Sequence, residues 1–270
     1  MKTPSSKQVD VVRLDASGDD VQCLEETAGV AIESALTIAI EDLDSYTILC
    51  SPDDRRAMAV GFLFSEGIIR SVDDIALMAD CMDSADMMRI RLSRAPQGKT
   101  ETPGRNLMVV SSCGMCGTTD MHERISALPR VGQTLRIDTE LMNRAMSLLD
   151  DRQDVYKRTR GTHAVLLFDG KGDAVSFAED IGRHNALDKA VGKMLLAGKK
   201  AEGFGAVLSG RVSFEMVSKC SLAGIEIILA VSAPTSLALE ASMHCGITLC
   251  AFAGDGGAAV FTHPERIHCA

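Results

Sequence analysis

The sequence predicts an α/β protein, in which a layered α/β domain over residues 121–270 follows a smaller α+β domain over residues 21–110. Two observations in the second half predict the layered domain. Short apolar runs rich in β-branched residues are typical of strands buried on both faces, and they occupy residues 163–168, 204–209 and 225–231. Helical stretches alternate with these runs, at residues 184–198, 213–223 and 235–244. This alternation favours a largely parallel central sheet.

The first half begins with a polar segment, residues 1–20, which we expect to be flexible. β-branched residues then alternate over residues 30–49 around an acidic turn, which predicts a hairpin. A Ser-Pro-Asp-Asp sequence supplies an N-cap, a first-turn proline and two acids, so we expect a helix that ends near Gly67. Another strand is expected over residues 86–94. A linker rich in Pro and Gly and a short strand then lead to a glycine-rich loop at residues 111–120.

Composition excludes some classes of function. The 37 acidic and 28 basic residues give a formal charge of −9, which disfavours nucleic-acid binding. The N-terminal residues contain no apolar signal segment, and no apolar run is long enough to span a membrane, so we expect a cytoplasmic protein. The nine cysteines are an odd number and are read as reduced thiols. Those in apolar surroundings are expected to be small buried hydrophobic residues, namely Cys23, Cys50, Cys81, Cys220, Cys245 and Cys250.

The most specific chemical pattern is Ser-Ser-Cys-Gly-Met-Cys-Gly, which contains Cys113 and Cys116. Two thiols at this spacing, with glycines inside and after the pair, favour sulfur transfer, because a thiolate accepts the sulfur and a slack backbone delivers it. A redox pair, a loop without function and half of a zinc site remain alternatives. The zinc site could be completed from His263, His268 and Cys269.

A second pattern, Glu-Asp-Ile-Gly-Arg-His-Asn, ends at Asn185 and leads into a predicted helix. Gly182 interrupts the chain, Asn185 or the residues before it cap the helix, and Arg183 and His184 lie beside free N–H groups. This arrangement suits an anion or a base, and the alternative is a capped surface turn.

Ligands of α/β sheets gather at the carboxyl ends of strands, and several junctions there carry suitable groups. Ser209 and Arg211 follow one buried strand, and hydroxyl residues at 232–236 follow the next. Together these junctions favour a ligand that carries phosphate. The Phe-Ala-Gly-Asp-Gly-Gly segment at 252–257 offers unobstructed backbone N–H groups or, alternatively, a hairpin turn. A zinc deaminase is disfavoured, because Val165 stands where the essential Glu would follow His163.

In combination, these motifs resemble the FdhD family of formate dehydrogenase accessory sulfurtransferases, from about residue 30 to the C-terminus. The motifs that carry the resemblance occur in the order SSCGMCG (111–117), GTHAVLLFD (161–169), EDIGRHNALDK (179–189), LSGRVSFEMVSK (208–219), SAPTSLALE (232–240) and GITLCAFA (246–253).

The resemblance implies a sulfur carrier that passes sulfur from a cysteine desulfurase to the molybdenum cofactor, in its bis-molybdopterin-guanine-dinucleotide form, for formate dehydrogenase. It implies a persulfide on Cys113, with Cys116 as the second thiol, a cytidine-deaminase-like second domain and a homodimer without a tightly held metal. The cofactor segment it implies comprises Phe252, Ala253, Gly254, Asp255, Gly256 and Gly257. By their position we add Arg183, His184, Asn185, Ser209 and Arg211 to the pocket. The alternative is a zinc-stabilised or nucleotide-binding module without transfer activity.

Overall fold

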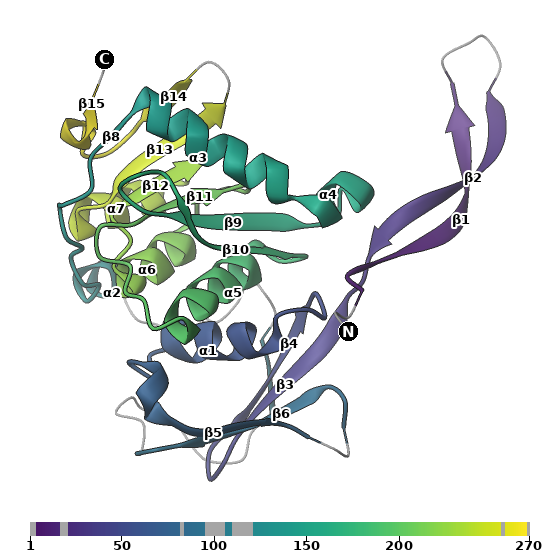
Figure 1. Ribbon diagram of the computed structural model, residues 1–270, viewed down its shortest axis with the longest axis horizontal. Coiled ribbons are helices and arrows are strands. Elements are labelled where there is room, and N and C mark those ends of the chain that lie inside the picture. The colour runs from purple at the N-terminus through teal and green to yellow at the C-terminus, as the bar shows by residue number, and fades with distance from the viewer. Residues whose placement is uncertain are drawn as a thin grey trace.

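The structure, a computed structural model, describes residues 4–16, 21–81, 84–94, 106–109, 121–254 and 257–268. Figure 1 shows a two-stranded arm, a small sheet with one long helix, and a larger sheet between helices.

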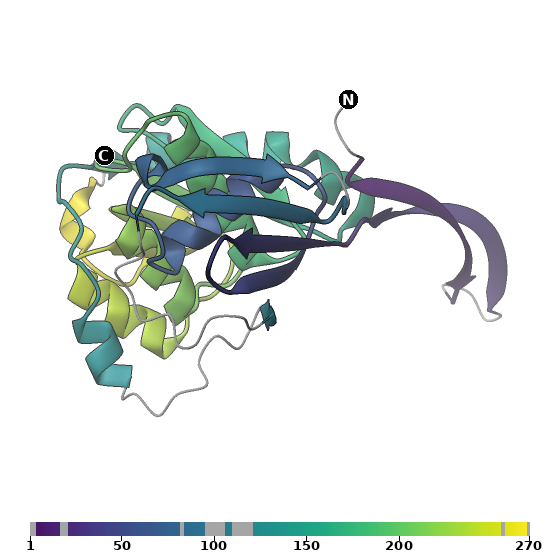
Figure 2. The ribbon, with the colours of Figure 1, turned by 90° about the horizontal axis from the view of Figure 1, so that it is seen from below.

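The arm consists of β1 (Ser6–Asp15) and β2 (Gln22–Ala31), which pair antiparallel along their whole length. It projects from the rest of the protein in both ribbon views (Figure 1, Figure 2). Residues 6–15, which belong to the segment expected to be flexible, form strand β1. Backbone hydrogen bonds to β2 hold this strand without an apolar core.

The small sheet has the strand order β5-β6-β3-β4-β7, and α1 packs on it. The predicted hairpin is confirmed as β3 and β4, the predicted helix as α1, and the predicted strand as β6. Met58 and Phe62 of α1 pack on Leu36 and Ile38 of β3, which gives this sheet one buried face. The bounds here are β3 (Ser34–Ile40), β4 (Ser45–Cys50), α1 (Arg55–Ser65), η1 (Val72–Asp74), β5 (Ile75–Asp80), β6 (Met87–Leu92) and β7 (Asn106–Val109).

The larger sheet has the order β10-β9-β11-β12-β13-β14. Only the β11–β12 and β12–β13 pairs are parallel, so the prediction of a largely parallel sheet is wrong. The prediction did not include β10, a half-buried strand that forms a hairpin with β9. Because of this extra strand, β9 runs antiparallel to β11 as well as to β10. Strand bounds are β8 (Ile137–Asp138), β9 (His163–Phe168), β10 (Ala174–Asp180), β11 (Gly205–Leu208), β12 (Ile227–Ala230), β13 (Thr248–Gly254), β14 (Gly257–Val260) and β15 (Ile267–His268).

Helices cover both faces of this sheet (Figure 1). Leu166 of β9 packs in the cluster that contains α3, whereas Val165 packs in the cluster that contains the three helices of the opposite face. Burial on both faces is thus confirmed, as are the three predicted helices α5, α6 and α7; the likeness to cytidine deaminases stays a prediction. Helix bounds are α2 (Met121–Ser126), α3 (Thr139–Arg152), α4 (Asp154–Thr159), α5 (Arg183–Leu196), α6 (Phe214–Ala223), α7 (Ser236–Cys245) and η2 (Pro264–Arg266).

Candidate functional site

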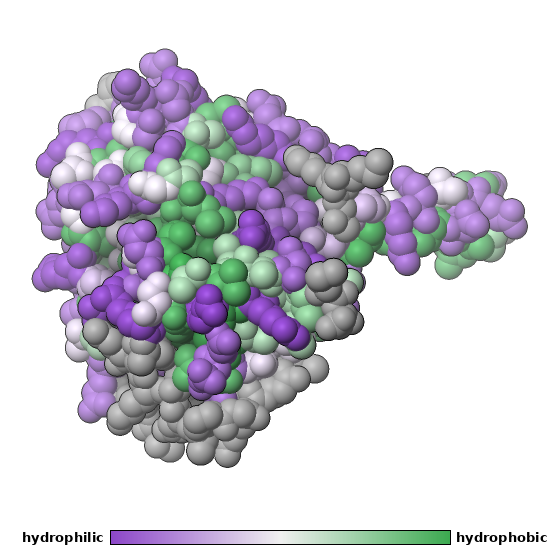
Figure 3. Space-filling view, turned by 60° about the horizontal axis from the view of Figure 1, so that its bottom comes forward, coloured by the Kyte–Doolittle hydropathy of each residue, from purple (hydrophilic) through white to green (hydrophobic). Residues whose placement is uncertain are grey.

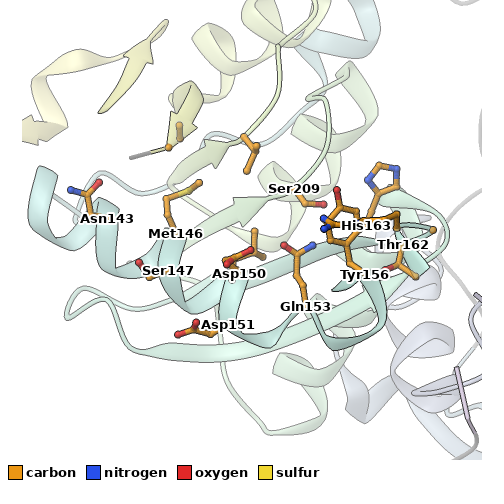
Figure 4. Close-up of a pocket in the computed structure, with 16 residues that line it drawn as sticks. Asn143, Met146, Ser147, Asp150, Asp151, Gln153, Tyr156, Thr162, His163 and Ser209 are labelled. Atoms are coloured by element: carbon orange, nitrogen blue, oxygen red, sulfur yellow. The ribbon is translucent and has the colours of Figure 1, made fainter. Parts of the chain in front are cut away.

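A cavity of about 990 Å³ lies at one edge of the larger sheet, where β11, β12 and β13 end. Ser209, Val231 and Ala253, at or just after these strand ends, line it, and Figure 4 shows Ser209 together with His163. Because β9 runs antiparallel to β11, its first residue, His163, reaches the same edge. The end of α3 and the start of α4 form the facing wall. The volume of the cavity is at the upper end of the roughly 300–1,000 Å³ usual for ligand pockets.

Glu179, near the end of β10, fixes this wall. Its buried carboxylate accepts hydrogen bonds from the backbone N–H of Val155 at 3.0 Å and of Tyr156 at 2.8 Å. It also accepts one from the hydroxyl of Thr162 at 3.1 Å. A carboxylate bound to the first N–H groups of a helix satisfies donors that the helix itself leaves unpaired. Glu179 therefore holds α4 against the sheet and sets the shape of the cavity.

Basic side chains gather beside the cavity. A Cβ placed on Gly210 would lie 3.1 Å from Nδ1 of His163 and 3.7 Å from Cβ of Arg183, so these residues are close neighbours. Burial lowers the pKa of His163, and the positive charges of Arg183 and Arg211 lower it further. The Nε of Arg183 is buried and, within the described residues, has no hydrogen-bond partner. In a chain of net charge −9, this local positive charge favours an anionic ligand.

Ser209 is positioned by the backbone of β9. The N–H of Ala164 donates to its Oγ at 2.8 Å, and the N–H of Ser209 donates to the carbonyl of Ala164 at 3.0 Å. Since its oxygen already accepts a bond, the hydroxyl proton remains to be donated to a ligand oxygen in the cavity.

The structure separates the residues predicted for the cofactor segment. Ala253 and Gly254 line the cavity, whereas Asp255 and Gly256 lie outside the described residues. Gly257 begins β14, which pairs antiparallel with β13. Phe252 has a positive φ of 54°, is 58% exposed and packs on Phe261 with ring centroids 6.1 Å apart. Its ring does not line the cavity.

His184 and Asn185 have packing partners instead of a place in the cavity wall. Nε2 of His184 lies 2.9 Å from Oε2 of Glu215. His184 and Asn185 are both buried, and neither lines the cavity. The amide of Asn185 donates to the carbonyl of Leu49 at 2.8 Å and to Asp180 at 2.9 Å. The N-cap of α5 is Gly182, one of the residues before Asn185, and it makes no side-chain capping bond.

Sequence reasoning missed the wall formed by α3 and α4, which contributes Asp150, Gln153, Tyr156 and Arg160. These residues belong to no motif. The one available signal was Tyr156, which is one of only two tyrosines in the chain.

The two thiols of the predicted transfer site, Cys113 and Cys116, lie outside the described residues. The prediction of buried, hydrophobic cysteines is confirmed for Cys50, Cys220, Cys245 and Cys250, but Cys23 is exposed and Cys81 is half-buried. Burial raises the pKa of Cys50 and of Cys250 to about 12, so both are protonated and unreactive near neutral pH.

No group of three His, Cys, Asp or Glu side chains in the described part of the chain could hold a metal ion. The zinc alternative is untested, because Cys113, Cys116 and Cys269 lie outside that part. The same part contains no helix long and apolar enough to cross a membrane.

Comparisons with known proteins agree with one another. A family model described as the FdhD/NarQ family matches residues 31–268. The chain is 34% identical to the sulfur carrier protein FdhD of Saccharolobus solfataricus, over 97% of this chain and 98% of that protein. It is 35% identical to the sulfur carrier protein FdhD of Thermoplasma acidophilum, over 90% and 88%. A crystal structure of a Desulfotalea psychrophila protein, assigned as a formate dehydrogenase accessory protein, has a TM-score of 0.76 at 25% identity, over 98% of this chain and 100% of that one.

Proposed function

Because this chain belongs to the FdhD/NarQ family, we propose that it is a sulfur carrier in the maturation of formate dehydrogenase. In this proposal Cys113 accepts sulfur from a cysteine desulfurase as a persulfide. The sulfur then passes to the molybdenum cofactor, in its bis-molybdopterin-guanine-dinucleotide form, which is the substrate. The proposal includes a cytoplasmic homodimer.

The observation that carries the proposal is the extent of the family match. It spans residues 31–268 and so includes both the cysteine pair and the residues that line the cavity. The relatives matched over nearly their full length are themselves named sulfur carriers.

Loading of Cys113 requires no oxidant. The Cys113 thiolate attacks the outer sulfur of the desulfurase persulfide, the S–S bond of the desulfurase breaks, and its cysteine leaves as a thiolate. One S–S bond forms and one breaks, so the sulfur moves without net oxidation. A free thiol has a pKa of about 8.5, so a few per cent of it is ionised at neutral pH. The thiols of Cys50 and Cys250, with pKa values of about 12, do not compete.

The cavity supports the second half of the proposal. The dinucleotide substrate carries pyrophosphate groups; Arg183 offers positive charge beside the cavity, and Ser209, next to His163 in its lining, offers a hydroxyl donor. Such charge-assisted contacts are among the stronger hydrogen bonds that proteins make.

Intact-mass measurement tests the proposal. We expect incubation with a cysteine desulfurase and free cysteine to add the mass of one sulfur atom, removable by a reducing agent and mapped to the peptide that contains Cys113. Cys113→Ala abolishes the addition. Cys23→Ala is the control, because this exposed thiol lies on the arm and should not affect loading.

Loading that persists in Cys113→Ala would overturn the assignment of this cysteine. Absence of loading in the unaltered protein, together with retained nucleotide binding, would instead support the nucleotide-binding module without transfer activity.

A further inference from the structure

The arm of β1 and β2 has two unlike faces in its outer half. Residues that pair across an antiparallel ribbon point to the same side, so Val12 and Leu14 share one face with Cys23. Val12 is 60% exposed, Leu14 is 66% exposed, and Cys23 is exposed as well. On the other face the Arg13 guanidinium donates to Glu26 at 2.9 Å. The first face, called the Leu14 face below, therefore exposes apolar groups, whereas the second carries an ion pair.

The Leu14 face continues a surface that is packed at the base of the arm. Gly29 lies on the same side of β2 as Cys23, because side chains alternate along a strand. A Cβ on Gly29 would lie 2.5 Å from the carbonyl oxygen of Arg158, so α4 covers this side at the base. Further out, the arm projects beyond the rest of the protein (Figure 1, Figure 2). An isolated two-stranded ribbon is at best marginally stable in water, so we expect another molecule to cover its outer half.

The small sheet offers a surface of matching character. α1 covers one face of this sheet, and no helix in the described part of the chain lies over the other, which is called the open face below (Figure 2). Leu49 and Leu77 lie on the open face and are 46% and 45% exposed. The hydroxyls of Thr37 and Thr47 share a hydrogen bond of 3.0 Å beside them. Figure 3, turned to bring this side forward, shows hydrophobic side chains gathered among hydrophilic ones.

The two surfaces carry opposite charges. Asp10 and Glu25 belong to the Leu14 face by register, are exposed, and make no ion pair with another described residue. On the open face, Arg89 and Arg91 are exposed. Arg91 lies 3.7 Å from the carboxylate of Glu41, whereas Arg89 has no ion pair within the described residues. Opposite charges of this kind steer two surfaces together and fix their register.

The buried area favours a second copy of this chain as the molecule that covers the arm. The outer half of the arm, residues 10–15 and 22–27, is roughly 20 Å long and about 10 Å wide at about 3.3 Å per residue. One such arm on one partner surface buries about 400 Å² in total, far below the roughly 1,200 Å² of the smallest stable interfaces. Two copies that each place an arm on the other bury about twice this area and bring further surface of both copies together.

We propose that two copies of this chain exchange arms, so that the Leu14 face of each arm lies on the open face of the other copy's small sheet. This inference rests on the homodimer included in the proposed function and names its interface. The aliphatic side chains of the arm cover Leu49 and Leu77. The two acids of the arm meet Arg89 and Arg91, and by symmetry each contact forms twice.

Sedimentation velocity of the full-length chain at several concentrations tests the inference, because it measures the dissociation constant of the dimer. We expect Leu14→Asp to raise this constant about tenfold or more, since it places a carboxylate in an apolar contact. Leu24→Asp is the matched control, because it makes the same change on the same arm but on the opposite face. The dimer of this control should dissociate as that of the unaltered protein does.

A charge exchange identifies the surface that receives the arm. Glu25→Arg and Arg89→Glu should each raise the dissociation constant about fivefold, and the double variant should recover part of this loss. The outer half of the arm lies away from β6 of its own chain in both ribbon views (Figure 1, Figure 2), so such a recovery arises between chains. Thermal unfolding checks that each variant is folded, as expected for exposed positions outside the hydrophobic cores.

Three results would overturn the inference. If the unaltered protein is a monomer at all concentrations, both this inference and the homodimer are wrong, whereas sulfur loading of Cys113 still tests the carrier function. If Leu14→Asp and Leu24→Asp affect the dimer equally, the Leu14 face is not the interface, although the homodimer stands. If Leu14→Asp weakens the dimer but Arg89→Glu does not, the arm does not lie on the small sheet of the other copy.

Discussion

At the scale of single residues, the Glu-Asp-Ile-Gly-Arg-His-Asn motif joins the two halves of the protein. Lys189, which follows it on α5, is completely buried. Its ammonium lies 2.7 Å from the carboxylate of Asp180 and donates to the carbonyl of Ser51 at 2.9 Å. The N–H of Ser51 in turn donates to Asp180 at 2.9 Å. This buried network links the segment between β4 and α1 to the segment between β10 and α5.

Replacing Lys189 with Met should destabilise the protein by about 3–5 kcal/mol, because it leaves the Asp180 carboxylate buried and unpaired. Urea unfolding measures this loss. The double variant Asp180→Asn/Lys189→Met should recover part of it, since no unpaired charge remains. Equal stability of the single and double variants would contradict the explanation.

The Lys189–Asp180 pair also makes the stability of the folded protein depend on pH in the alkaline range. Burial lowers the pKa of Lys189, but the charges of Asp180 and Asp53 raise it more, so its pKa in the folded protein is above the ordinary value. A lysine whose pKa is raised on folding contributes its full stabilisation of the folded protein at pH values below the unfolded-state pKa of about 10.4. This stabilisation is lost as the pH rises through the folded-state pKa. The Lys189→Met variant should therefore lack this part of the alkaline loss of stability.

At the scale of elements, α1 and α5 cross in close contact because a glycine of each helix lies against the backbone of the other helix. A Cβ on Gly192 of α5 would lie 1.9 Å from the carbonyl oxygen of Ala57, and one on Gly61 of α1 would lie 1.8 Å from that of Asp188. No side chain fits at either position unless the helices move apart. The crossing holds the small sheet against the larger domain.

Gly192→Ala should therefore cost about 1–3 kcal/mol, as overpacking of a close contact does. Thermal and urea unfolding check it. Gly170→Ala is the matched control, since its added Cβ would meet only Leu135 Cδ1 at the ordinary distance of 3.8 Å. A stability unchanged in Gly192→Ala would show that the helices can separate without loss.

Elements were predictable from the sequence where burial leaves a pattern. Apart from His163, strands β9, β11 and β12 contain only apolar residues or glycine because both faces of the sheet are covered, and they were predicted at residues 163–168, 204–209 and 225–231. α3 buries only Met142, Ala145 and Leu149 along one side, and β10 is half-buried, so neither gives a strong signal.

The site divides in the same way. Ser209 was predicted because it follows a recognisable buried strand, whereas Ala253 and Gly254 were predicted only because they fall in the segment that the family resemblance implies. The place of Gln153 in the cavity lining could not be predicted, because the wall that contains it forms only when α3 folds onto the sheet. His184, in contrast, belongs to a conspicuous polar motif, yet the structure buries it against Glu215.

At the scale of the whole molecule, the arm formed by β1 and β2 projects away from the rest of the protein. Its outer half exposes large aliphatic side chains, among them Val12, Leu14 and Val21. Figure 3 shows hydrophobic side chains among hydrophilic ones along this projection. Its base, however, meets α4: a Cβ on Gly29 would lie only 2.5 Å from the carbonyl oxygen of Arg158. The arm therefore contacts the same helix that carries Tyr156 into the cavity.

This contact predicts an effect at a distance. In Gly29→Ala either β2 or α4 must shift, because the added methyl group meets backbone and not a flexible side chain. We expect weaker binding of GDP, a probe for the guanine nucleotide of the proposed substrate, measured by calorimetry, with the sulfur loading of Cys113 unchanged, since the substitution alters the wall around Tyr156 and not the thiol. Leu24→Ser, on the outer half of the arm, is the control; surface changes of this kind stay within about 0.5 kcal/mol, so both GDP binding and stability should hold. Equal GDP affinity in Gly29→Ala and the unaltered protein would mean that the arm yields and that α4 is held by Glu179 alone.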